Sequence, residues 1–153
     1  MINIITYILF LVSPIKKEIT PISDLELKAN LLFSYIESFN KFPKINALKT
    51  AYAQICFENG NGKIIYNHNL GNIGASKGTP YYKHGGYSFR SFNSHYEASI
   101  AYWSHLKNRC NYALNLFESG NQKQVAIALK SCGYYRADTE HYARNLESLF
   151  ANF

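Results

Sequence analysis

One stretch in the middle of this chain interrupts an otherwise helical pattern. From Lys63 to Phe92 the apolar residues have no helical spacing, so this stretch is not expected to form a helix. Ile64–Tyr66 and Tyr87–Phe89 have the composition of short strands. The surrounding loops contain Gly71, Gly74, Gly78, Gly85 and Gly86. The sequence therefore predicts a mainly α fold with a short β-hairpin-like lobe.

Amphipathic helices are predicted on both sides of this stretch. Ser23 and Glu26 have the spacing of a capping box, as do Ser94 and Glu97, so each pair marks the start of a helix. The predicted helices span 24–40, 46–58, 94–107, 110–118, 121–131 and 139–151. Of the 153 residues, 47% are hydrophobic and 17% are charged, so the chain can bury the core of one domain.

The N-terminal residues differ in composition from the rest. The apolar run Ile2–Val12 is too short for an ordinary transmembrane helix, and it lacks the preceding basic residues of a typical signal peptide. Residues 1–20 are therefore interpreted as a leader, which is either a weak export signal, a hydrophobic anchor or a segment that packs on the domain. Residues 21–153 are expected to form that domain.

The net charge of +6 favours an anionic partner, such as nucleic acid, a membrane surface or an anionic cell-wall polymer. The basic residues are scattered rather than clustered, so no nucleic-acid partner is expected. The three cysteines, Cys56, Cys110 and Cys132, include no C-x-x-C pair, which leaves open one disulfide with one free thiol. The five histidines lack the spacing of a metal-binding motif.

Glu58 is the residue that best fits a catalytic role. It ends a predicted helix, and no Asp or Glu follows until Glu97. The helix dipole disfavours an anion at that position, and apolar neighbours such as Phe57 raise the pKa of a carboxyl group, so Glu58 is suited to donate a proton. The 63–92 lobe is expected across a cleft from it. The alternative interpretation is an exposed glutamate at a helix end.

Four blocks of the sequence carry a family resemblance. They are Ala53–Gly60 (AQICFENG), Tyr66–Ile73 (YNHNLGNI), Phe89–Glu97 (FRSFNSHYE), and Gly133–Asp138 (GYYRAD) with Tyr142–Ala143. In this order and spacing they resemble the lysozyme-like peptidoglycan glucosaminidases of glycoside hydrolase family 73, especially the compact phage- and secretion-associated members. The similarity spans roughly 45–150 and implies a lysozyme-like fold.

The resemblance also implies specific roles. Glu58 matches the general acid that protonates the glycosidic oxygen of a β-1,4 N-acetylhexosamine linkage in peptidoglycan, and Tyr134 matches a second catalytic position. The residues implied to bind substrate are Gln54, Asn69, Asn72, Tyr135 and Tyr142. The alternatives are support of the acid for Gln54, turn formation for the two asparagines, and core packing for Tyr134 and Tyr135. No cofactor is implied. The expected location is the periplasm or the extracellular cell wall, reached through the leader or through a phage or secretion apparatus.

The chain departs from the family at the second acid, because residues 59–96 contain no carboxylate. Two-carboxylate chemistry needs a base or nucleophile opposite the acid. The remaining routes are participation by the substrate's N-acetyl group or attack by the 6-hydroxyl of muramic acid, as in lytic transglycosylases. A muramidase and a catalytically silent glycan-binding or tail-associated domain also stay open. A nucleophilic Cys56 is disfavoured, since a cysteine in an apolar helix is usually a buried hydrophobe.

Overall fold

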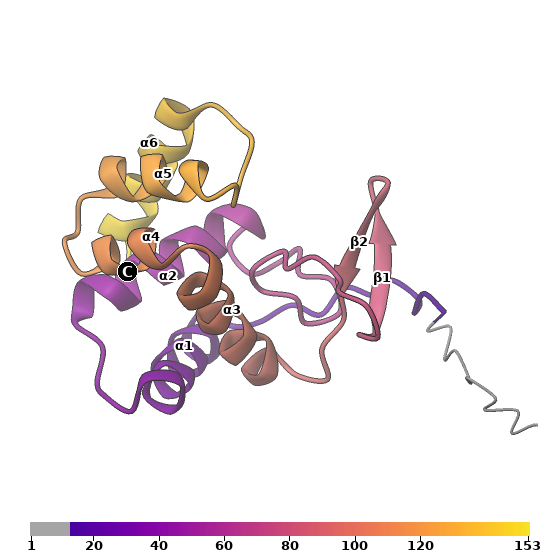
Figure 1. Ribbon diagram of the computed structural model, residues 1–153. Helices are drawn as coiled ribbons and strands as arrows, with labels where there is room; N and C mark the ends of the chain where they lie inside the picture. Colours follow the sequence, from indigo (N-terminus) through magenta and orange to yellow (C-terminus); the bar gives the residue numbers. More distant parts are fainter. Residues whose placement is uncertain (1–12) are drawn as a thin grey trace, which may run out of the picture.

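The computed structural model describes residues 13–153, which form a helical body with a lobe on one side (Figure 1). The helices are α1 (Asp24–Phe39), α2 (Ile45–Glu58), α3 (His95–Arg109), α4 (Asn111–Phe117), α5 (Gln122–Ser131) and α6 (Thr139–Ala151), and the strands are β1 (Tyr81–His84) and β2 (Tyr87–Arg90). The apolar run at 2–12 lies outside the described residues, so its role as a signal or anchor stays a prediction. No helix within residues 13–153 is long and apolar enough to cross a membrane.

The six predicted helices are confirmed, and no bound differs from its predicted position by more than two residues. Both expected N-caps form. The backbone N–H of Glu26 donates to Oγ of Ser23 at 3.2 Å, and that of Glu97 donates to Oγ of Ser94 at 3.1 Å. Local sequence chemistry therefore decided where α1 and α3 begin.

The core lies between the helices, with α2 packed against α1, α4 and α6. Trp103 of α3 is fully buried, and its indole N–H donates to the carbonyl oxygen of Leu31 in α1 at 3.2 Å. Its ring also meets Tyr35 edge-on, with the ring centroids 5.1 Å apart. This aromatic contact fixes α3 against α1, and α3 in turn positions one wall of the site described below.

The lobe contains an antiparallel hairpin, but only one of its strands was predicted. Tyr87–Phe89 lies within β2 as expected, whereas its partner is β1 and not Ile64–Tyr66. In 64–66 only Tyr66 forms a bridge, and it does so with Ile19. The hairpin closes through Gly85 and Gly86, whose positive φ angles of 56° and 81° permit a tight two-residue turn.

The segment before α1 is hydrogen-bonded along the lobe. The backbone N–H groups of Ile15, Thr20 and Ile22 donate to the carbonyl oxygens of Tyr81, Ile65 and Gly62 at 2.7, 2.8 and 3.1 Å, respectively. The boundary expected between residues 20 and 21 therefore lies inside a segment that is hydrogen-bonded to the lobe, in line with the alternative of a segment that packs on the domain. Figure 1 shows this segment, in indigo, running beside the hairpin before it enters α1.

The three cysteines form one disulfide and leave one free thiol. Cys110 and Cys132 form a disulfide, with the sulfur atoms 2.02 Å apart. Cys56 is a free thiol and is buried. The disulfide joins the residue after α3 to the residue after α5. Both residues are next to the groove described in the following subsection.

Candidate active site

Glu58 is the last residue of α2, and its half-buried carboxyl group faces a groove. The next residue, Asn59, fixes this end of the helix. Its side-chain amide donates to the carbonyl oxygen of Ile55 at 3.1 Å and also to that of Leu70 in the lobe. The helix end and the lobe are therefore held together directly below Glu58.

Two side chains hold the Glu58 carboxyl group. The hydroxyl of Tyr142 donates to Oε1 at 2.9 Å, and the amide of Asn72 donates to Oε2 at 3.3 Å. Burial raises the pKa of Glu58 above its usual value, while these two hydrogen bonds oppose the rise. The environment that the sequence predicted for Glu58 is therefore present, and burial is its main cause.

A chain of buried polar groups lies behind the carboxyl group. Tyr102 donates to Oε1 of Gln54, and Nε2 of Gln54 donates to the Tyr142 hydroxyl at 3.5 Å. Gln54 has no exposed surface, which favours the alternative that it supports the acid, and its contact with substrate stays a prediction. Because it lies one helical turn before Glu58, it orients Tyr142 from below.

Tyr135 and Tyr142 were also predicted to bind substrate, but neither lines the groove, and their contact with substrate stays a prediction. Their rings stack with centroids 3.7 Å apart, and only 9% of Tyr135 and 1% of Tyr142 is exposed. The Tyr135 hydroxyl donates to the carbonyl oxygen of Ala126 at 2.9 Å. The stack holds the Tyr142 ring at the correct angle, so both residues serve the carboxyl group of Glu58 rather than the groove surface.

The two asparagines of the 66–73 loop have different roles. Asn69 is fully buried, and its side chain bonds to backbone groups of Ile73 and Arg90 at 2.8–2.9 Å. It shapes the loop, in line with the turn-forming alternative, and its contact with substrate stays a prediction. Asn72 is exposed, has a positive φ of 49°, and donates its side-chain amide to Oε2 of Glu58. A contact between Asn72 and substrate stays a prediction.

Tyr134 forms part of the groove wall. Its hydroxyl donates to the carbonyl oxygen of Gly71 at 2.9 Å. Burial, followed by the nearby Glu58 charge, raises its pKa well above the usual value for tyrosine, so the hydroxyl stays protonated. A protonated hydroxyl cannot act as a base. The predicted catalytic role of Tyr134, through its ring and hydroxyl dipole beside Glu58, stays a prediction.

The groove consists of two hollows that meet at Glu58, Asn72 and Tyr134. The hairpin arm has a volume of about 400 Å³ and is further lined by Asn59, Ile64, Tyr66, Tyr82, His84 and Phe89. The helix arm has a volume of about 160 Å³ and is further lined by Gly71, Ile73, Gly74, His105, Arg109 and Gly133. A linear polymer in this groove would pass over the Glu58 carboxyl group.

Glu58 is the only acidic residue that lines either arm within residues 13–153. The half-buried rings of Tyr66 and Phe89 offer apolar faces suited to stacking on sugars. Sequence reasoning did not assign these rings, nor His105 and Arg109, to the groove. The i, i+4 spacing of the last two places them on one face of α3, but the sequence does not say which face meets Glu58.

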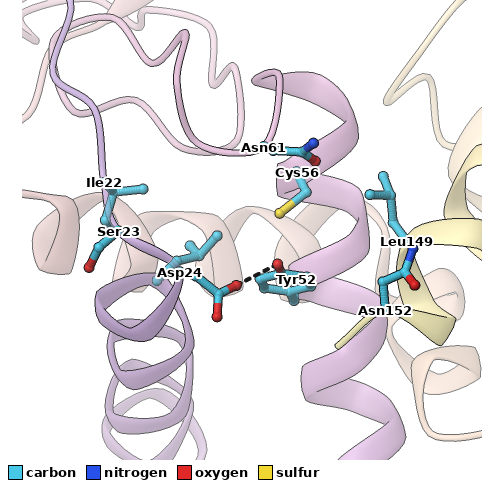
Figure 2. A pocket seen from close by; sticks show the side chains of 9 residues that line it. Ile22, Ser23, Asp24, Tyr52, Cys56, Asn61, Leu149 and Asn152 are labelled. Carbon is cyan, nitrogen blue, oxygen red and sulfur yellow. Dashed lines mark hydrogen bonds between the residues drawn. The ribbon is translucent and has the colours of Figure 1, made fainter.

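A separate pocket lies on another side of α2 and has a volume of about 290 Å³ (Figure 2). Figure 2 shows Tyr52 and Cys56 facing Asp24, and the Tyr52 hydroxyl donates to the Asp24 carboxylate at 2.5 Å. Burial raises the pKa of the Cys56 thiol, which makes it a poor nucleophile. In residues 13–153 no three or more His, Cys, Asp or Glu side chains gather to hold a metal ion.

Comparison with known proteins gives matches only at the level of structure. No protein-family profile and no curated protein sequence matches the chain. A peptidoglycan hydrolase from Sphingomonas sp. A1 superposes with a TM-score of 0.58 at 20% identity, over 80% of this chain and 86% of that one. The glycoside hydrolase domain of Salmonella typhimurium FlgJ superposes with a TM-score of 0.55 at 22% identity, over 86% and 88%, respectively.

The chain has the fold of these two hydrolases. The predicted mainly α, lysozyme-like fold with a short hairpin lobe is therefore confirmed. The names of the two neighbours, a peptidoglycan hydrolase and a glycoside hydrolase domain, agree with the sequence resemblance. At 20–22% identity the similarity is one of fold, and activity depends on the residues of the site.

Proposed function

We propose that this protein cleaves the glycan strands of peptidoglycan at a β-1,4 N-acetylhexosamine linkage, as an N-acetylglucosaminidase with Glu58 as the general acid. One observation carries the proposal: Glu58 lies where the two arms of an open groove meet, with a pKa raised by burial and with both carboxyl oxygens held by hydrogen bonds. The names of the two structural neighbours and the resemblance at 45–150 support the choice of substrate.

The hydrogen bonds assign different tasks to the two carboxyl oxygens. Oε1 accepts the Tyr142 hydroxyl in a partly buried contact, whereas Oε2 meets Asn72 at the exposed side. Oε2 is therefore the oxygen that can carry the transferable proton into the groove. When that proton passes to the glycosidic oxygen, the bond from C1 to that oxygen breaks, and the Tyr142 hydrogen bond stabilises the carboxylate that remains.

Among residues 13–153 no second acid lines the groove, so the next step needs another nucleophile. In the hydrolytic route, the acetamido oxygen of the substrate attacks C1, and Glu58, now a carboxylate, removes a proton from the water that opens the resulting ring. In the alternative route of a lytic transglycosylase, the 6-hydroxyl of muramic acid attacks C1 and gives its proton to Glu58. One carboxyl group with a raised pKa can serve as acid and then as base in either route.

The cell wall outside the cytoplasm is the site of action that fits this proposal. A disulfide such as Cys110–Cys132 persists in oxidising compartments and is rare in the cytosol. The net charge of +6 favours retention on an anionic wall. Delivery through residues 1–12, or through a phage or secretion apparatus, remains part of the proposal.

The test is to incubate purified peptidoglycan with the wild-type protein and with Glu58→Gln, and to identify the released fragments by mass spectrometry before and after borohydride reduction. Reducible glucosamine ends are the expected result. Reducible muramic ends would indicate a muramidase, and 1,6-anhydro ends would indicate a transglycosylase. Glu147→Gln is the matched control, because it removes an exposed carboxylate that does not line the groove.

Release of the same fragments by wild type and Glu147→Gln, but not by Glu58→Gln, supports the proposal. If no fragment depends on Glu58, the enzyme proposal is wrong. A wild-type protein that sediments with peptidoglycan without cleaving it would instead be a glycan-binding domain.

A further inference from the structure

The helix arm of the groove has one feature that proton transfer by Glu58 does not use. Its outer wall is the last turn of α3, where His105 and Arg109 lie one helical turn apart. Arg109 is exposed, and within residues 13–153 none of its nitrogen atoms lies within ion-pair distance of a carboxylate. An arginine in a groove with no partner of its own is available to bind an anionic group of a ligand.

His105 accounts for the orientation of this wall. The ring is half-buried and meets the Tyr134 ring edge-on, with centroids 5.7 Å apart. Burial lowers the pKa of His105, and the neighbouring Arg109 lowers it further, so the imidazole is neutral at neutral pH. The permanent positive charge in this arm therefore belongs to Arg109, while His105 packs the wall against Tyr134.

The disulfide holds the two walls of the arm at a fixed separation. Cys110 directly follows Arg109, and Cys132 directly precedes Gly133 and Tyr134 on the other wall. A covalent bond between the flanking residues limits how far the arm can open. The cation is thus held on a constrained wall beside the catalytic carboxyl group.

We propose that the helix arm is a subsite for the carboxylate-bearing sugar of the peptidoglycan strand, with Arg109 binding a carboxylate of the muramoyl side chain. The inference rests on the proposed function and adds specificity to it. Only every second sugar of the strand carries this side chain, so a carboxylate subsite in one arm sets the register of the strand. The register in turn decides which of the two alternating glycosidic bonds lies over Glu58.

The carboxylate could be that of the lactyl group or one of the peptide stem, and three ligands separate these sources. Stem-bearing glycan has stem carboxylates but an amidated lactyl group, amidase-stripped glycan has free lactyl carboxylates, and the N-acetylglucosamine hexamer has neither. Affinities are measured by calorimetry in a Glu58→Gln background, where no turnover is expected. Arg109→Gln is then added to that background.

Lys107→Gln is the matched control. Lys107 is exposed in the same last turn of α3, so its charge also interacts favourably with the helix dipole. Its ammonium lies over the Phe39 ring, 5.6 Å from the centroid, and the residue does not line the helix arm. Arg109→Gln should weaken binding of a carboxylate-bearing glycan about tenfold, the usual effect of one charge-assisted hydrogen bond. Binding of the hexamer should be unchanged, and Lys107→Gln should match the parent for all three ligands.

The binding measurements test the subsite, and they do so separately from the proposed enzymatic activity. A loss confined to stripped glycan assigns the lactyl carboxylate, and a loss confined to stem-bearing glycan assigns the stem. An equal loss for all three ligands, or no loss for any, overturns the subsite. Fragment release by the wild-type protein tests the proposed function independently, because it does not depend on Arg109 binding a carboxylate.

Discussion

Gly71→Ala is the substitution whose effect follows most directly from the geometry of the groove. Gly71 lies in the helix arm between Leu70 and Asn72, and its carbonyl oxygen accepts the Tyr134 hydroxyl at 2.9 Å. A Cβ atom added here would lie 2.8 Å from the Tyr102 ring and 3.2 Å from the Tyr134 hydroxyl. Tyr102 is fully buried, so its ring cannot move aside, and the loop must shift instead.

The expected cost has two sources. Overpacking a well-packed site destabilises by about 1–3 kcal/mol. A loop shift also lengthens or breaks the Tyr134 hydrogen bond, worth about 1 kcal/mol. We therefore expect Gly71→Ala to lower the free energy of unfolding by about 2–4 kcal/mol, which for a chain of this size lowers the melting temperature by about 4–16 °C.

The assay is thermal unfolding followed by circular dichroism, with Gly74→Ala as the control. Gly74 lies in the same loop, does not have a positive φ, and has no atom within 4 Å of an added Cβ. Its substitution should leave the melting temperature unchanged or raise it slightly, because alanine restricts the unfolded chain. Equal melting temperatures for the two variants would refute the reasoning that Tyr102 and Tyr134 fix the loop that carries Asn72.

Three further predictions concern the carboxyl group and the disulfide. Tyr142→Phe removes a hydrogen bond that lowers the Glu58 pKa. The alkaline limb of the activity–pH profile should therefore move to higher pH, and the maximal rate should fall. An unchanged limb would mean that Glu58 is not the titrating acid. Burial raises the folded-state pKa of Glu58, so its charged form opposes folding as the pH rises above the ordinary value of 4.5. In urea unfolding, Glu58→Gln should therefore be more stable than wild type at neutral pH. The difference in stability should vanish in acid. Replacing both Cys110 and Cys132 by serine opens a link between positions 22 residues apart and should cost about 3 kcal/mol in the same assay, whereas an unchanged midpoint would show that the link contributes nothing to stability.

The helices and the acid could be predicted because their signals are local. The caps at Ser23 and Ser94 follow from side chains that bond to backbone groups three residues away. The placement of Glu58 at a helix end follows in the same way, from the apolar spacing before it and the Asn–Gly stop after it. The hairpin was only half predicted, because strand pairing depends on which segments meet in space, and Ile64–Tyr66 meets the N-terminal segment instead of β2.

The burial of several predicted site residues could not be read from the sequence. Gln54, Asn69 and Tyr135 belong to the blocks that carry the family resemblance, but a sequence motif does not show which of its side chains are buried. Gln54, for example, lies 88 residues from the Tyr142 hydroxyl that it bonds, so its burial depends on how α2 packs against α6.

The sequence by itself thus determined the helical framework, the tight turns and the single acid at the end of α2, because these depend on neighbours within a few residues. Only the tertiary structure decided which tyrosine holds the Glu58 carboxyl group and which cysteines pair. It also decided that Arg109 reaches the groove. Those relations depend on burial and on distances between segments far apart in the chain, which exist only once α2, α3, α6 and the lobe have packed together.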